Sequence, residues 1–142
     1  MIHLDTNYLI GLLVKGSQQA AHVDGWLAAA EPLAASAIAW TEFLNGPVTA
    51  LEVTQAEAVL GGRIIPFGQS GAVLAADLFN KTGRRRGSRF DCLIAAAAVL
   101  AHADVATVNQ SDFAAFHSHG LKLAPPPPLP QPPCPPPGAA GN

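Results

Sequence analysis

The chain begins Met1-Ile-His-Leu-Asp-Thr-Asn-Tyr-Leu-Ile10, and this stretch predicts the class of fold. Mostly apolar residues run directly into Asp5, and an apolar helical pattern follows at Leu9, Ile10 and residues 12–14. A short buried strand that turns into a helix at an acid places that acid at the carboxyl end of the strand. In open parallel α/β sheets, ligands bind at that end. The opening therefore predicts a functional carboxylate at Asp5, with a simple helix N-cap as the alternative.

The bulk composition predicts one globular domain in the cytoplasm. The chain has 142 residues, of which 49% are hydrophobic and 13% charged, enough to build a core. The longest apolar runs, such as residues 93–101, are far shorter than the roughly 20 residues of a membrane span. The N-terminus lacks the basic region and cleavage site of a signal peptide. We therefore expect no membrane association.

Short apolar runs alternate with helical patterns along the chain. We expect strands at 2–4, 33–36, 63–66, 105–108 and 121–123. Helices are expected at 6–14, 17–30, 37–45, 69–82, 89–102 and 111–116, and a further short one is expected to open with a capping box at 54–57. Short strands separated by helices favour a five-stranded parallel sheet covered on both faces, which is an α/β fold.

The composition changes abruptly at Pro125. Ten of the thirteen prolines lie in residues 125–137, and such a tract forms neither a helix nor a central strand. We therefore expect a folded domain at 1–124 and a disordered, proline-rich tail at 125–142. A ligand for a partner's aromatic groove is the alternative for this tail.

Four of the ten acidic residues occupy positions that suit one common site: Asp5, Glu42, Asp91 and Asp112. Glu42 is the only charged residue between Pro32 and Pro47, and a carboxylate among apolar neighbours is costly unless it is paired or binds a cation. Each acid also has a structural alternative. Glu42 can face solvent, and the two aspartates beyond it can each serve a first helical turn.

Convergence of these four acids would require a raised pKa or a cation. Two unit charges about 4 Å apart cost roughly 4 kcal/mol at an effective dielectric near 20. An all-oxygen ligand set suits Mg²⁺ or Mn²⁺ better than zinc. Such an ion activates water and stabilises the oxygens in phosphodiester hydrolysis. The five histidines and Cys92 form no competing site, and we expect them to be structural.

Four short motifs, in this order, resemble those of the PIN domain, and in particular those of the VapC-type toxin ribonucleases. They are Leu4-Asp-Thr-Asn7, Trp40-Thr-Glu-Phe-Leu44, Asp91-Cys-Leu-Ile-Ala-Ala96 and Thr107-Val-Asn-Gln-Ser-Asp-Phe113. The order and spacing fit over about residues 1–124. One departure is Val108, where these toxins often carry arginine, and this puts one substrate contact in doubt.

The resemblance implies a three-layer sandwich with a five-stranded parallel sheet. It implies catalytic metal ligands at Asp5, Glu42, Asp91 and Asp112, with Thr6 and Asn109 supporting the site. It further implies endoribonuclease activity with Mg²⁺ or Mn²⁺, a homodimer, and inhibition by a cognate antitoxin protein.

A run of basic residues lies directly before Asp91: Arg84, Arg85, Arg86 and Arg89. We expect these side chains to hold RNA phosphates beside the metal, although a solvated basic loop explains the run equally well. Two other functions remain open. One is a PIN-fold module that binds RNA or protein without catalysis. The other is a phosphatase of the haloacid-dehalogenase type, although such enzymes carry a second aspartate where this chain has Asn7.

Overall fold

A computed structural model of the chain describes residues 1–130, so the expectations for residues 131–142 lie outside the described part. Four parallel strands form one sheet in the order β3-β2-β1-β4. This confirms the predicted α/β class. The strands are β1 (Ile2–Leu4), β2 (Leu33–Ser36), β3 (Ile64–Ile65) and β4 (Asp104–Ala106). The expected fifth strand at 121–123 is reduced to one parallel bridge between Val105 and Leu123.

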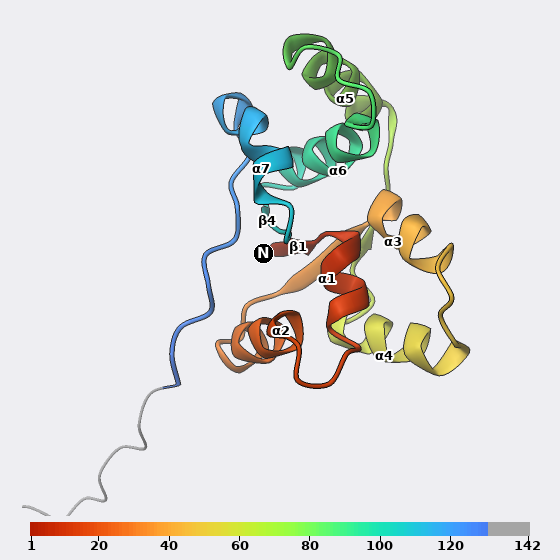
Figure 1. The fold of residues 1–142 in the computed structure, drawn as a ribbon, viewed down its shortest axis with the longest axis vertical. Helices are drawn as coiled ribbons and strands as arrows, with labels where there is room; N and C mark the ends of the chain where they lie inside the picture. The colour runs from red at the N-terminus through yellow and green to blue at the C-terminus, as the bar shows by residue number, and fades with distance from the viewer. Residues whose placement is uncertain (131–142) are drawn as a thin grey trace, which may run out of the picture.

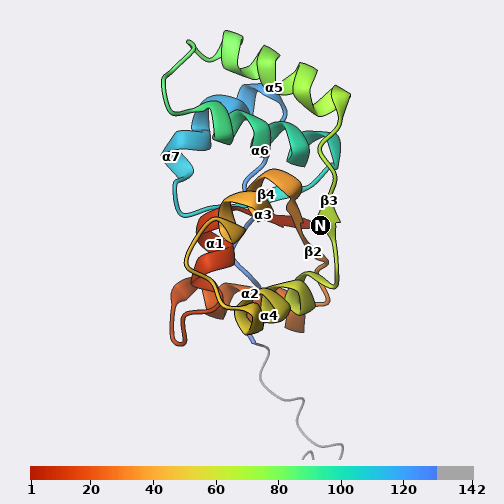
Figure 2. The ribbon, with the colours of Figure 1, turned by 90° about the vertical axis from the view of Figure 1, so that its right-hand side faces the viewer.

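Helices cover both faces of this sheet (Figures 1 and 2). Helices α5, α6 and α7 lie on one side, whereas α1, α2 and α4 lie on the other. The bounds are α1 (Thr6–Gly11), α2 (Gln18–Ala28), α3 (Ala37–Leu44), α4 (Ala50–Leu60), α5 (Gln69–Lys81), α6 (Arg89–Leu100) and α7 (Gln110–Phe113), followed by a 3₁₀ helix, η1 (Ala114–His119). No helix within residues 1–130 is long and apolar enough to cross a membrane.

Side-chain caps set most of the helix starts. Ser17 caps α2 by accepting from Ala20 N–H at 3.0 Å, and Ser36 ends β2 and caps α3 in the same way. The capping box expected at 54–57 is wrong. The box is formed by Thr49 and Glu52 at the start of α4, and Thr54 lies inside that helix. Both positions carry a threonine with glutamate three residues later, so the local pattern fits either start.

The sheet register places the ends of β1 and β4 side by side. Leu4 pairs with Ala106, and the N–H of Asp5 donates to the carbonyl of Ala106 at 3.0 Å. The residues that follow these two strands, Asp5 and Thr107, therefore meet at the carboxyl edge of the sheet. Behind them, the alanines of α6 are buried and allow this helix to pack closely on the strands.

His3 in the central strand is a buried imidazole without a hydrogen-bond partner. Its side chain is 1% exposed, and within residues 1–130 neither ring nitrogen has a partner. Burial, helped by the charge of the N-terminus, lowers the pKa of His3 from 6.5 to about 4. The unfolded chain therefore binds a proton at a higher pH than the folded chain does.

We expect acid to destabilise the protein through His3. As the pH falls from about 6.5 to about 4, His3 should remove up to about 3 kcal/mol of unfolding free energy. Urea denaturation at several pH values measures this loss, and His3→Leu should flatten the curve in that window. The exposed His102 serves as the matched control position, because its side chain lies outside the core. Equal curves for wild type and His3→Leu would contradict the assignment.

Candidate functional site

Asp5 lies at the centre of a polar cluster at the carboxyl edge of the sheet. Its side chain is 5% exposed, and three donors surround it. The Thr6 N–H donates to Oδ1 at 2.8 Å, whereas the Asn7 amide and the Thr107 hydroxyl donate to Oδ2 at 3.0 and 2.7 Å. Burial raises the pKa of Asp5, and these three hydrogen bonds oppose that rise. Asp5 is thus the N-cap of α1, and Oδ1 keeps one lone pair free for a further partner.

Asn7 and Thr107 hold Asp5 in place, and neither was predicted as a site residue. Besides their bonds to Asp5, Asn7 donates to the Thr107 hydroxyl at 3.3 Å and accepts from the Val108 N–H at 3.2 Å. These bonds join the end of β1 to the end of β4 across about 100 residues of sequence. Their positions could have identified them, because Asn7 comes shortly after β1 and Thr107 directly follows β4, the strand that pairs with β1.

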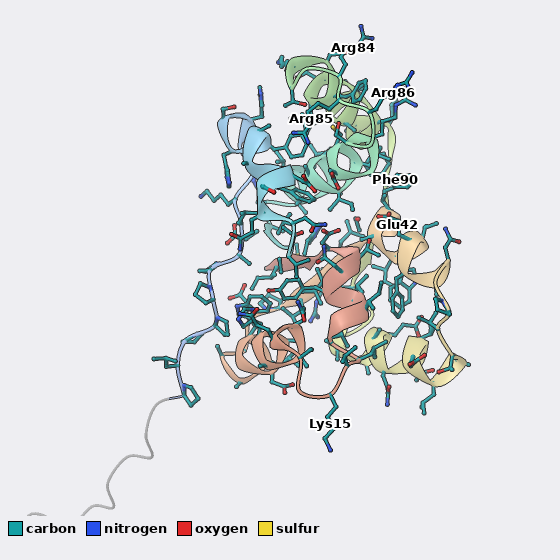
Figure 3. All side chains as sticks on the ribbon, viewed as in Figure 1. Lys15, Glu42, Arg84, Arg85, Arg86 and Phe90 are labelled. Carbon is teal, nitrogen blue, oxygen red and sulfur yellow. The ribbon has the colours of Figure 1, made fainter. Side chains whose placement is uncertain are left out.

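Glu42 approaches the same site from α3. Its carboxylate accepts the Thr6 hydroxyl at 2.9 Å. Thr6 therefore connects two of the predicted acids, since its N–H bonds Asp5 and its hydroxyl bonds Glu42. The support expected from Thr6 thus consists of these two hydrogen bonds. Glu42 is half-buried at the edge of α3, and Figure 3 shows it close to the start of α6 near Phe90.

Asp91 in the first turn of α6 lies within the field of the other three acids. Its pKa rises from 3.8 to about 6, first through burial and then through the negative charges of Asp5, Asp112 and Glu42. The positive charge of Arg85 partly offsets this rise. The structure therefore brings four acids from four separate elements into one electrostatic cluster, which we call the acidic cluster. Such perturbed carboxylates are typical of functional sites.

Asp112 on α7 forms the outer edge of the acidic cluster. Its side chain is 47% exposed and lies 3.9 Å from the Arg85 guanidinium, a distance at which an exposed pair contributes little stability. Asn109 was expected to orient Asp112 or substrate. Within the described chain its side chain makes no hydrogen bond. Its backbone carbonyl accepts from the Asp112 N–H at 3.0 Å, and its own N–H donates to the Thr107 hydroxyl at 3.1 Å.

The four arginines before and within α6 do not act as one group. Arg85 alone pairs with an acid of the cluster, and its carbonyl accepts from the buried Ser88 hydroxyl at 2.8 Å. Arg89 lies over the Phe79 ring at 5.5 Å. Figure 3 shows Arg84 and Arg86 extending outward from the loop between α5 and α6. The prediction that all four hold phosphates remains a prediction, and the geometry favours Arg85.

The donor chemistry of the acidic cluster fits Mg²⁺ or Mn²⁺. All the groups are oxygens, and four carboxylates face a single nearby guanidinium. In this conformation, however, no three Asp, Glu, His or Cys side chains within residues 1–130 are arranged as the ligands of one ion. Glu42 is instead bonded to Thr6, and Asp112 is paired with Arg85. Both side chains are only partly buried.

Two surface hollows of about 270 and 490 Å³ lie away from the acidic cluster. They are lined by the loop before α5, by α5 itself and by the end of α6, including Phe67, Val73 and Leu100. None of the four acids lines either hollow.

Comparison with known families gives a match to the model for the PIN domain over residues 2–117. This span includes all four acids and covers every strand of the sheet. Among curated proteins, no match to the chain was found.

Similar solved structures come from bacteria. FitAcB from Neisseria gonorrhoeae has 25% identity and a TM-score of 0.66, and the match covers 89% of this chain and 98% of that one. A toxin–antitoxin complex from Klebsiella pneumoniae has 25% identity and a TM-score of 0.57, covering 80% and 91%. VapBC2 from Rickettsia felis, bound to a DNA fragment from its promoter, has 22% identity and a TM-score of 0.63, covering 87% and 98%.

Proposed function

The chain belongs to the PIN-domain family, and from this we propose that it is a divalent-metal-dependent endoribonuclease. The observation that carries the proposal is the acidic cluster. Burial raises the pKa of Asp91 on α6, and the negative charges of the other three acids raise it further, near the carboxyl edge where a parallel sheet binds its ligands. Those three acids are Asp5 at the end of β1, Asp112 on α7 and Glu42 on α3. A protein keeps such a repulsive arrangement when it serves a cation or a reaction.

In the proposed enzyme, Asp5, Glu42, Asp91 and Asp112 would hold Mg²⁺ or Mn²⁺. When bound, the ion would supply an activated water and stabilise charge on the phosphate oxygens. The residues of this chain position the ligands. Thr107 and Asn7 fix the rotamer of Asp5, and Thr6 steers Glu42 toward it. Arg85 lies at the rim, where a guanidinium can contact an RNA phosphate.

The proposal extends to a biological setting. The similar Klebsiella structure is a toxin–antitoxin complex, and we propose that this chain is the toxin of such a pair, inhibited by a cognate antitoxin. A homodimer and a cytoplasmic location belong to the same proposal. The exposed apolar side chains at Val73 and Leu100 provide one face on which a second copy can bury apolar surface.

The test is cleavage of a single-stranded RNA of mixed sequence by the purified protein. We expect cleavage with Mg²⁺ or Mn²⁺ and its complete loss when EDTA is in excess, since the carboxylates alone offer no electrophile. Cleavage that survives EDTA would contradict the mechanism. RNA binding of equal affinity with and without the ion, with no turnover, would instead favour a catalytically inactive PIN-fold binding module.

A further inference from the structure

The proline-rich segment leaves the sheet and makes specific contacts with α2. Val105 N–H donates to the Lys122 carbonyl, and Ala124 N–H donates to the Val105 carbonyl, both at 2.8 Å. One residue later, the Pro125 carbonyl accepts the Trp26 indole N–H at 3.2 Å. Figures 1 and 2 show the segment running alongside α2. The match to the family model ends at residue 117, so these contacts lie beyond it.

A glycine on α2 leaves room for one proline ring. A Cβ atom added at Gly25 would lie 2.6 Å from the Cβ and 2.8 Å from the Cγ of Pro127, closer than side-chain atoms approach. Glycine inside a helix is normally unfavourable relative to alanine. Its presence here coincides with the closest approach of Pro127, which gives the glycine a packing role.

Aromatic neighbours fix the orientation of the Trp26 indole. Its ring centroid lies 5.8 Å from that of Tyr8 and 5.6 Å from that of His22, and the Tyr8 hydroxyl and His22 Nδ1 are 2.8 Å apart. Trp26 is 3% exposed, so the packed ring holds its N–H toward the Pro125 carbonyl. A fixed indole donor beside a notch for a proline ring is the chemistry with which aromatic grooves bind polyproline.

Within residues 124–128, two residues three positions apart are less exposed than the prolines around them. Ala124 and Pro127 are half-buried, whereas Pro125, Pro126 and Pro128 are exposed. A polyproline II helix has three residues per turn, so a spacing of three is the one expected for an edge that contacts a neighbouring element. The prolines also fix their own backbone angle, which lowers the entropy lost when the segment docks.

We propose that Trp26 and Gly25 form a polyproline-binding seat on α2, and that its occupant is residues 124–128 of the same chain. The occupant is in cis, because Ala124, which bonds to β4, and Pro125, which bonds to Trp26, are consecutive residues. The seat is independent of the proposed nuclease. The segment and Glu42 lie on opposite sides of the molecule in the view of Figures 1 and 3.

Hydrogen exchange of the two tryptophan indoles in the full chain tests the seat, with Trp40 on α3 as the internal control. We expect Pro127→Gly to speed exchange at Trp26 on the order of tenfold and to leave Trp40 unchanged. Pro126→Gly makes the same backbone change at an exposed proline and should have no effect on either indole. Equal effects of the two variants on Trp26 would overturn the proposal. So would loss of Trp26 protection on dilution, because the occupant would then come from a second copy.

A double-mutant cycle tests the notch at Gly25. In the wild-type background, Gly25→Ala should lower the melting temperature and speed Trp26 exchange, because the added methyl displaces Pro127. In the Pro127→Gly background the same change should raise the melting temperature, as alanine does inside helices. A gain in both backgrounds would overturn the proposal. RNA cleavage, if present, should be equal in all these variants, so a failed seat and a failed nuclease give different results.

Discussion

Asp5→Asn is expected to reduce RNA cleavage at least about 100-fold. Mutating a residue that only hydrogen-bonds to a metal ligand already lowers metal affinity or activity about 10–100-fold, and Asp5 is proposed to be a ligand itself. The substitution removes the charge but keeps the shape. Asparagine is also a good N-cap, so the start of α1 should survive. Circular dichroism and the melting temperature check that the fold is retained, and initial cleavage rates at saturating Mn²⁺ measure the effect.

Asp104→Asn is the matched control for this variant. Asp104 begins β4, at the opposite end of the same sheet, and belongs to no part of the acidic cluster. We expect its cleavage rate to stay within about twofold of the wild type, as for a surface substitution away from the site. If Asp5→Asn also stayed within that range while folding normally, Asp5 would not be a ligand, and the nuclease mechanism would lose its central residue.

The position of the acids followed from the sequence, whereas their mutual contacts did not. Asp5 lies after a buried apolar run and Glu42 is isolated among apolar residues, and both patterns are visible along the chain. The hydrogen bond from Thr107 to Asp5 depends on β4 lying next to β1. Rules for chain connections restrict the strand order but do not fix it, so this contact required the structure.

The sequence presented a helix cap and a functional carboxylate as alternatives for Asp5, and the structure shows the cap without excluding the other role. One oxygen of Asp5 caps α1, and the carboxylate as a whole is the most buried of the four acids. A carboxylate has about four acceptor positions, so a cap uses only part of its capacity. Pattern analysis assigns one role to each residue and therefore treats such roles as competing.

For the four arginines near Asp91, the sequence predicted the charge but not the direction of each side chain. The sequence predicted positive charge beside Asp91, which is correct, but it gave the four arginines the same role. Positive φ angles at Gly83, Arg84 and Gly87 turn the loop so that its side chains diverge. Only Arg85 pairs with an acid of the cluster. Side-chain direction in an irregular loop depends on the backbone at each residue, which composition does not encode.

Divalent ions are expected to raise the melting temperature in the absence of RNA. A ligand at 100 times its dissociation constant stabilises the folded state by about 2.7 kcal/mol, which corresponds to roughly 10 °C for a domain of this size. Differential scanning fluorimetry with Mn²⁺ and with EDTA measures the shift, separately from catalysis. Asp77→Asn, at an exposed ion pair with Lys81 on α5, should shift as the wild type does. Equal melting temperatures in Mn²⁺ and EDTA would contradict the metal site.

Asp91→Asn should have the opposite effects in the two conditions. The pKa of Asp91 is 3.8 in the ordinary state and about 6 in the fold, so above pH 6 its ionised form destabilises the folded state. At pH 8 in EDTA the variant should therefore melt at a higher temperature than the wild type, and the difference should vanish near pH 4. With Mn²⁺ the variant should show little of the wild-type shift, because one ligand and one negative charge are missing. These two results together would show that Asp91 lowers the stability of the metal-free protein and is needed for metal binding. A lower melting temperature in EDTA, or an undiminished shift with Mn²⁺, would contradict that assignment.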